Sequence, residues 1–111
     1  MAGERDKVLS FLGLARKAGK IASGEFQTEE AVKKGRASAV ILAEDASDNT
    51  KKKFRNMCEW HNVRVFCYSD RETLGSAVGC GARSSLAVTD PGFASVIIKA
   101  LGQDAGRERR Y

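Results

Sequence analysis

The sequence lacks the features that mark membrane, disulfide-bonded and metal-binding proteins. No apolar run approaches the roughly twenty residues that cross a bilayer. The cysteines are three, an odd number, and Cys58, Cys67 and Cys80 are too scattered for a disulfide framework or a zinc site. His61 stands three residues after Cys58, but a metal needs more ligands than one pair and the chain offers no second pair. We therefore expect reduced thiols that pack as small hydrophobes, no bound metal and no cofactor.

A secretion signal is also missing, because residues 1–6 lead into a charged amphipathic helix without an apolar core. We expect a cytoplasmic protein that makes no membrane contact. The 111 residues, 42% hydrophobic and 30% charged, suffice to bury one core without disulfides or metal. The sequence predicts a single domain over residues 1–101. Residues 102–111 have little to bury and carry three arginines, so they are predicted to be a basic, disordered tail of a monomer.

Side-chain sets for catalysis are scarce as well. The single histidine, His61, falls on the apolar stripe of a predicted helix, which indicates a packed residue rather than a general base. Gly79 and Gly81 follow a helix and precede a strand, the reverse of the order in a dinucleotide-binding loop. Glu44 and Asp45 could form a carboxylate pair, although neighbours in sequence usually point apart and a solvated strand exit is the simpler interpretation. The sequence therefore predicts a protein that is not an enzyme.

Helical and strand patterns alternate along the chain. Apolar residues spaced for one helical face, and short β-branched runs, predict five helices and four strands. The helices cover roughly the first seventeen residues and then residues 25–34, 51–61, 70–78 and 91–101; the strands lie near residues 21–22, 38–43, 63–68 and 86–89. Ser69 with Glu72 resembles a capping box, and Asp90 before Pro91 opens the last helix. This order predicts an α/β fold, a three-layer α/β/α sandwich on a small mixed four-stranded sheet, with residues 38–43 as a central strand.

Two segments about fifty residues apart carry groups suited to binding RNA. A net charge of +5 and a pI near 9.3 favour an acidic partner. Gly24 would let a nucleic-acid backbone approach a helix N-terminus, and Gln27 can both donate to and accept from a base edge. Glu25 could accept from a guanine, and Arg83 could clamp a phosphate or stack on a base. The residues alone leave open that Gly24 only turns the chain, and that Gln27, Arg83 and the lysines at 51–53 are solvated surface.

The order of several motifs adds a resemblance over about residues 7–101. The chain carries Gly-x-x-Gln-Thr, then Ala-Val-Ile-Leu-Ala-Glu-Asp-Ala, then Leu-Gly-x-Ala-Val-Gly and Ala-Val-Thr-Asp. This order resembles the L7Ae/L30e superfamily of ribosomal proteins. The segments at residues 13–20, 23–25 and 82–94 resemble its bacterial YlxQ-like branch.

The resemblance implies the L30e-like sandwich and an RNA-binding function. Such proteins grip a kink-turn, a bent RNA with a bulge and tandem sheared G·A pairs, so a structured ribosomal or messenger RNA is the implied partner, in a ribonucleoprotein, with no DNA bound. Phe26-Gln27 stands where archaeal relatives have Asn-Glu, and Glu30 stands where they have lysine. The implied RNA-binding residues are Gly24, Glu25, Phe26, Gln27, Thr28, Glu44, Lys51, Cys80, Gly81, Ala82 and Arg83.

Two other functions stay open at this stage. The same sandwich serves as a protein-interaction module in stress-response regulators, although a basic sequence disfavours that use. It also occurs as the RNA-recognition domain of some RNA methyltransferases. The present chain is too short to include a methyl-transfer domain, so it could recognise RNA without modifying it.

Overall fold

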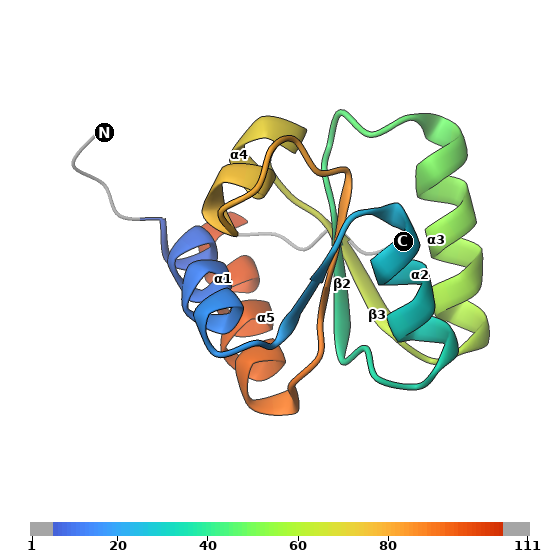
Figure 1. Cartoon of the computed structure of the whole chain (residues 1–111), viewed down its shortest axis with the longest axis horizontal. Helices are drawn as coiled ribbons and strands as arrows, with labels where there is room; N and C mark the ends of the chain where they lie inside the picture. The colour runs from blue at the N-terminus through green and yellow to red at the C-terminus, as the bar shows by residue number, and fades with distance from the viewer. Residues whose placement is uncertain (1–5, 106–111) are drawn as a thin grey trace.

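Helices cover both faces of a twisted four-stranded sheet in the computed structural model, which describes residues 6–105 (Figure 1). The helices are α1 (Lys7–Lys17), α2 (Glu25–Lys33), α3 (Asp48–Trp60), α4 (Arg71–Ala77) and α5 (Pro91–Ala105), and the strands are β1 (Ile21–Ser23), β2 (Ala39–Leu42), β3 (Arg64–Cys67) and β4 (Ser85–Val88). The predicted α/β sandwich on a mixed four-stranded sheet is confirmed.

The strand order places three chain segments at one edge of the sheet. The order is β1-β4-β2-β3, with β2 parallel to β3 and β4 antiparallel to both of its neighbours. Strands β1, β2 and β3 therefore end at the same edge at which β4 begins. In Figure 1 this is the upper edge of the sheet, and the segments that follow β1 and precede β4 meet there.

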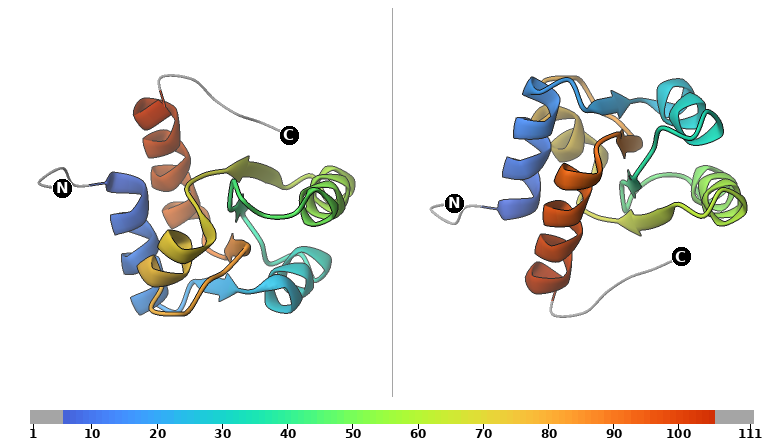
Figure 2. Two further views of the ribbon diagram at one scale, coloured as in Figure 1. Left: turned by 90° about the horizontal axis from the view of Figure 1, so that it is seen from above. Right: turned by 90° about the horizontal axis from the view of Figure 1, so that it is seen from below.

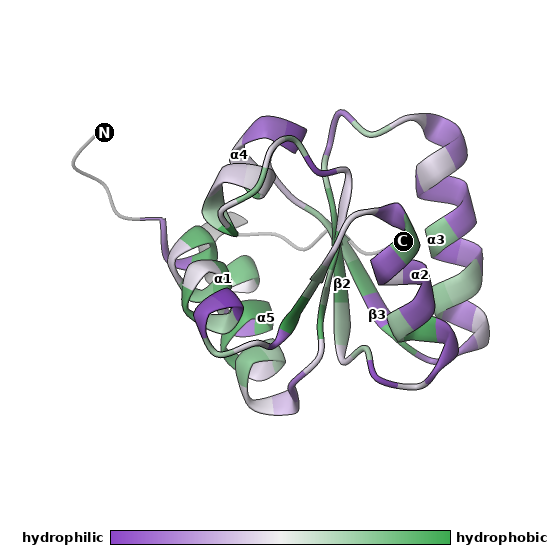
Figure 3. Ribbon diagram, viewed as in Figure 1, coloured by the Kyte–Doolittle hydropathy of each residue, from purple (hydrophilic) through white to green (hydrophobic). Residues whose placement is uncertain are grey.

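Successive side chains of a strand point to opposite faces of the sheet, so each strand contributes to two cores, one under each layer of helices. Ala39 and Ile41 of β2 pack with α1, α4 and α5, whereas Val40 and Leu42 pack with α2 and α3. All four are fully buried, which confirms β2 as a central strand covered on both faces. Figure 2 shows the two layers end-on, and in Figure 3 the strands are apolar while the outward faces of α2 and α3 are polar.

Side-chain caps begin several of the helices. Asp6 accepts a hydrogen bond from the Leu9 backbone N–H at 3.0 Å, and Asp90 accepts from that of Phe93 at 2.9 Å. The predicted capping box at Ser69 is wrong, because Asp70 is the N-cap of α4. Ser69 has a φ of +64°, whereas an N-cap residue takes the extended conformation that Asp70 adopts. The backbone N–H of Thr73, which donates to the Asp70 carboxylate, lowers the pKa of that group.

The ends of two helices differ from the predicted ones, and one of them corrects a prediction. His61 is exposed rather than packed, because α3 ends at Trp60 and His61 is its C-cap, so the apolar stripe stops one turn earlier. Helix α5 continues to Ala105, past residue 101, at which the sequence predicts the domain to end. The rest of the predicted tail lies outside the described residues.

The cysteines are free, as the sequence predicts. Cys58 and Cys67 are buried and Cys80 is half-buried. Burial raises the pKa of the Cys58 thiol to about 11, because a thiolate is poorly solvated in an apolar core. Within residues 6–105, no helix combines the length and hydropathy of a membrane span. No group of three metal-ligating side chains occurs in the same part of the chain.

Candidate nucleic-acid interface

The two segments singled out in the sequence lie side by side at the upper edge of the sheet. Strands β1 and β4 pair with Ser23 opposite Leu86, so the chain that leaves β1 meets the chain that enters β4. The Ser23 hydroxyl also lies 3.8 Å from the Cys80 sulfur. Between the segments is a hollow of about 450 Å³, lined by Ser23, Gly24, Glu25, Phe26, Gln27, Ala82, Arg83 and Ser84.

Helix α2 opens into this hollow at Gly24. Gly24 has a φ of +95°, a conformation that side chains disfavour, and no side chain caps the helix. Its N–H donates to the Ser85 carbonyl at 3.0 Å, and its carbonyl accepts from the Thr28 N–H at 2.9 Å. The N–H groups of residues 25–27 then have no partner within the helix. They form a small cluster of donors at the positive end of the helix dipole.

The side chains of this first turn differ in accessibility. Phe26 is 70% exposed and Gln27 is exposed, so both can touch a ligand on the surface. Thr28 is fully buried, which leaves its side chain to packing rather than to contact. Glu25 accepts from the Lys53 ammonium at 3.0 Å.

Arg83 closes the hollow from the other side. A Cβ built on Gly24 would lie 3.7 Å from the Arg83 Nε, so the guanidinium lies within van der Waals contact of position 24. The Arg83 backbone N–H donates to the Arg71 carbonyl at 3.0 Å, and its Nη1 donates to the Ala82 carbonyl at 3.0 Å. The guanidinium is therefore held beside the N-terminus of α2 by its own loop.

Gly75 fixes the position of the loop that carries Arg83. A Cβ on Gly75 would lie 1.7 Å from the Gly81 carbonyl oxygen, so only glycine allows the loop to rest on α4. The Gly75 carbonyl also accepts from the Cys80 N–H at 2.8 Å. This role of Gly75 was not predicted from the sequence. One sequence signal could have indicated it, namely a glycine inside a helical pattern. Glycine has a low helix propensity, so a glycine at such a position often has a role in packing.

A third loop, between β2 and α3, joins the same edge. The Lys51 ammonium donates to the Glu44 carbonyl at 2.7 Å, and the Glu44 N–H donates to the Ser69 carbonyl at 2.7 Å. Asp45 accepts from the Arg71 N–H at 2.9 Å, and its carboxylate lies 3.5 Å from the Arg71 Nε. Glu44 and Lys51 thus lie at the same edge of the sheet as the hollow, but they do not line it. The Asp45–Arg71 link was also missed.

Ion pairs offset the acidic side chains of α2. Lys53 bridges Glu25 and Glu29 at 3.0 and 2.9 Å, and Lys33 lies 2.8 Å from Glu29. Hydrogen bonds from Lys33 and then Lys53 lower the pKa of Glu29, and those to Glu29 and Glu25 raise the pKa of Lys53. Glu30 pairs with Lys34 at 3.1 Å. These acids therefore repel a phosphate less than their number suggests.

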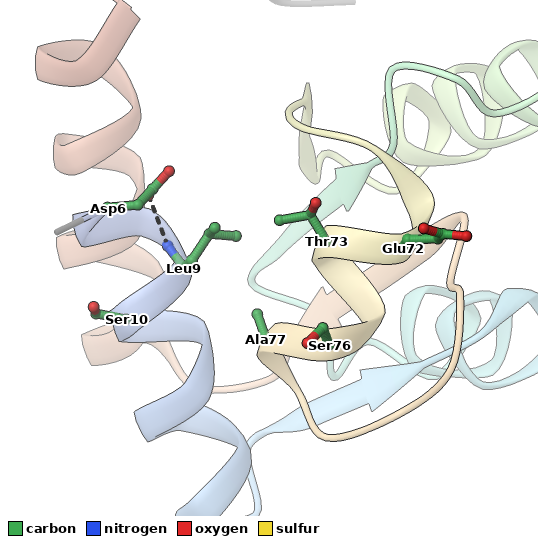
Figure 4. A pocket seen from close by; sticks show the side chains of 7 residues that line it. All are labelled: Asp6, Leu9, Ser10, Glu72, Thr73, Ser76 and Ala77. Atoms are coloured by element: carbon green, nitrogen blue, oxygen red, sulfur yellow. Dashed lines mark hydrogen bonds between the residues drawn. The ribbon is translucent and has the colours of Figure 1, made fainter. Parts of the chain in front are cut away.

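A second hollow, between α1 and α4, has a different chemistry (Figure 4). Its volume is about 510 Å³, and it is lined by Asp6, Leu9, Ser10, Glu72, Thr73, Ser76 and Ala77. Asp6 is already engaged, because its carboxylate accepts from the Leu9 N–H and, at 2.6 Å, from the Tyr68 hydroxyl. Two carboxylates and no cation line this hollow, so it does not suit an RNA backbone.

Two bacterial proteins that share one name are similar in sequence to most of this chain. The RNA-binding protein YlxQ of Bacillus subtilis (strain 168) is 42% identical over 90 residues, which cover 81% of this chain and 90% of that protein. The RNA-binding protein YlxQ of Enterococcus faecium is 34% identical over 92 residues, 83% of this chain and 88% of that protein. These matches confirm the resemblance to the YlxQ-like branch.

Solved structures give the same fold. A protein with unknown function from Bacillus halodurans C superposes with a TM-score of 0.83 at 36% identity, covering 86% of this chain and 97% of the other. The Giardia lamblia 15.5kD RNA binding protein superposes with a TM-score of 0.74 at 20% identity, covering 96% and 92%. That second likeness concerns the fold alone. A sequence profile of the ribosomal protein L7Ae/L30e/S12e/Gadd45 family matches residues 6–98, and the chain therefore belongs to this family.

Proposed function

We propose that the chain is a non-catalytic RNA-binding protein that recognises a kink-turn-like bend in a structured RNA. One observation carries the proposal: the uncapped N-terminus of α2 at Gly24 and the loop of Arg83 form one hollow at a single edge of the sheet. The name of the YlxQ relatives supports RNA as the ligand. We place the function in a cytoplasmic ribonucleoprotein and expect the protein to act as a monomer.

The groups in the hollow suit different parts of such an RNA. The first-turn N–H groups and the Gln27 amide can hydrogen-bond the base edges that sheared G·A pairs present. Arg83 can hold a phosphate bidentately, which an ammonium cannot. Phe26 is exposed enough to pack against a flipped base, and the loop at Glu44 and Lys51 would lie beside that nucleotide.

The test compares two RNAs of equal length and charge. One carries a bulge and tandem G·A pairs, and in the other those pairs are replaced by Watson–Crick pairs. Wild type should bind the first at least tenfold more tightly, and Gln27→Ala should raise that Kd by roughly tenfold, as for one lost hydrogen bond in a closed interface. Both dissociation constants can be measured by titration calorimetry.

Asn56→Ala is the matched control, because Asn56 is an exposed amide residue of α3 that does not line the hollow. It should leave both dissociation constants unchanged. Equal affinity of the wild type for the two RNAs would refute kink-turn recognition.

A further inference from the structure

The far end of α3 carries an aromatic side chain that the fold leaves in water. Trp60, the last residue of α3, is 85% exposed, whereas Phe54 of the same helix is fully buried. Tryptophan is usually well buried, because its large ring gains much from leaving water. Packing of the core therefore does not account for the placement of Trp60.

The pairing of α2 with α3 shows what lies beside this ring. The two helices run in the same direction in Figure 1 and lie side by side in both views of Figure 2. Lys53 of α3 is level with Glu25 and Glu29 of α2, because its ammonium bridges both carboxylates. Trp60 follows Lys53 by two helical turns, about 10 Å. It therefore comes level with residues 32–36, which are the last residues of α2 and those that follow it.

That end of α2 is basic. Lys33 and Arg36 are both exposed, and within the described residues Arg36 makes no ion pair. Lys33 reaches back to Glu29 on the side away from this end. Lys34 pairs with Glu30, so Arg36 is the cation that remains for a ligand at this end of α2.

We propose that Trp60 and Arg36 form a second RNA contact, which stacks a base of a single-stranded segment on the indole and holds a flanking phosphate. An exposed ring beside a cation is the arrangement by which proteins bind unpaired strands without reading their sequence. The contact lies at the opposite end of α2 from Gly24. It does not depend on kink-turn recognition, and it extends the proposed function to a strand that runs along α2.

The only tryptophan in the chain makes the test direct, because all indole fluorescence comes from Trp60. The probe is a short unstructured oligouridylate at low salt. We expect saturable quenching of the emission, since a stacked base quenches indole. Trp60→Ala should raise the Kd of a dye-labelled oligouridylate roughly tenfold by anisotropy, and Trp60→Phe should restore part of the affinity. Arg36→Gln should weaken binding by a smaller factor and lower its salt dependence.

Controls separate this contact from the hollow at Gly24. Leu14→Ala removes an exposed apolar side chain, 52% exposed, from the other helical layer and should change nothing. Gln27→Ala should leave oligouridylate binding intact, and Trp60→Ala should leave the preference for G·A pairs intact. The proposal is overturned by unchanged fluorescence at saturating oligouridylate, by equal affinity of Trp60→Ala and wild type, or by quenching with polyglutamate alone, which would mark a protein partner.

Discussion

At Gly75 a single missing Cβ decides where the Arg83 loop lies. The Gly81 carbonyl occupies the space that a methyl group would need. The backbone fixes the position of a Cβ, and the carbonyl is itself backbone, so the contact cannot be relieved by a side-chain rotation. Either the loop or the helix must shift, and the loop residues Gly81 and Ala82 are exposed whereas Gly75 is buried.

Gly75→Ala should therefore separate helix stability from RNA binding. Alanine favours a helix over glycine by about 1 kcal/mol, but here the loop at residues 80–83 must move away from α4. We expect the Kd for the G·A-containing RNA to rise tenfold or more, with NMR shifts at the amides of residues 80–84. Gly102→Ala is the control, because a Cβ there meets nothing within 4 Å. If Gly75→Ala bound the RNA as tightly as the wild type, binding would tolerate a displaced loop.

The residues that the sequence singled out and that line the hollow are those with a local signal. Gly24 stands out because it directly precedes a predicted helix. Arg83 stands out because it is an arginine in a predicted loop, and neither observation needs knowledge of a distant contact. Gly75 and Asp45 act through contacts with residues 6 and 26 positions away in sequence. No periodicity encodes such contacts. His61 was misplaced because an apolar stripe gives the face of a helix but not its last residue.

At the scale of elements, three loops are connected through Arg71. Its N–H donates to the Asp45 carboxylate after β2, and its carbonyl accepts from the Arg83 N–H before β4. Both side chains of the Asp45–Arg71 pair are about half exposed, so the pair itself adds little to the free energy of unfolding. Its role is to hold the first residue of α4 in a position that orients the Arg83 loop.

Asp45→Ala should loosen this edge of the sheet without unfolding the protein. We expect Tm to change by no more than a few degrees, since an exposed pair contributes about 0–1 kcal/mol. Hydrogen exchange of the Arg83 amide should become faster, and RNA affinity should fall severalfold. Asp48→Ala removes an equal charge from the first turn of α3 and should leave that amide unchanged. Equal exchange at Arg83 in both variants would show that Arg71 holds the loop without Asp45.

The element pattern was predictable because short apolar runs and helical stripes are local, whereas the pairing of strands is not. The run at residues 38–43 indicated a strand buried on both faces, and β2 is such a strand. The position of β4 between β1 and β2 follows from packing across the whole chain. No local pattern in the sequence gave this order, and the order is what brings Gly24 and Arg83 to one hollow.

At the scale of the whole molecule, the net charge does not give the number of cations that are free to bind phosphate. The chain has 19 basic and 14 acidic residues, a net charge of +5. Several lysines, including Lys33, Lys34 and Lys53, are engaged by carboxylates. These cations release few counterions when RNA binds, because each already has an anionic partner. The salt dependence of binding should thus reflect a few cations near the hollow.

The slope of log K against log salt for the G·A-containing RNA tests this expectation. Each phosphate neutralised contributes close to one unit to the slope, so Arg83→Gln should reduce it by roughly one. Lys99→Gln removes an equal charge from an exposed position on α5, in the layer away from the hollow, and should leave the slope unchanged. If both variants lower the slope equally, RNA is held by the overall charge of the protein. A loss confined to Arg83→Gln would instead indicate one phosphate held where the loop meets the N-terminus of α2.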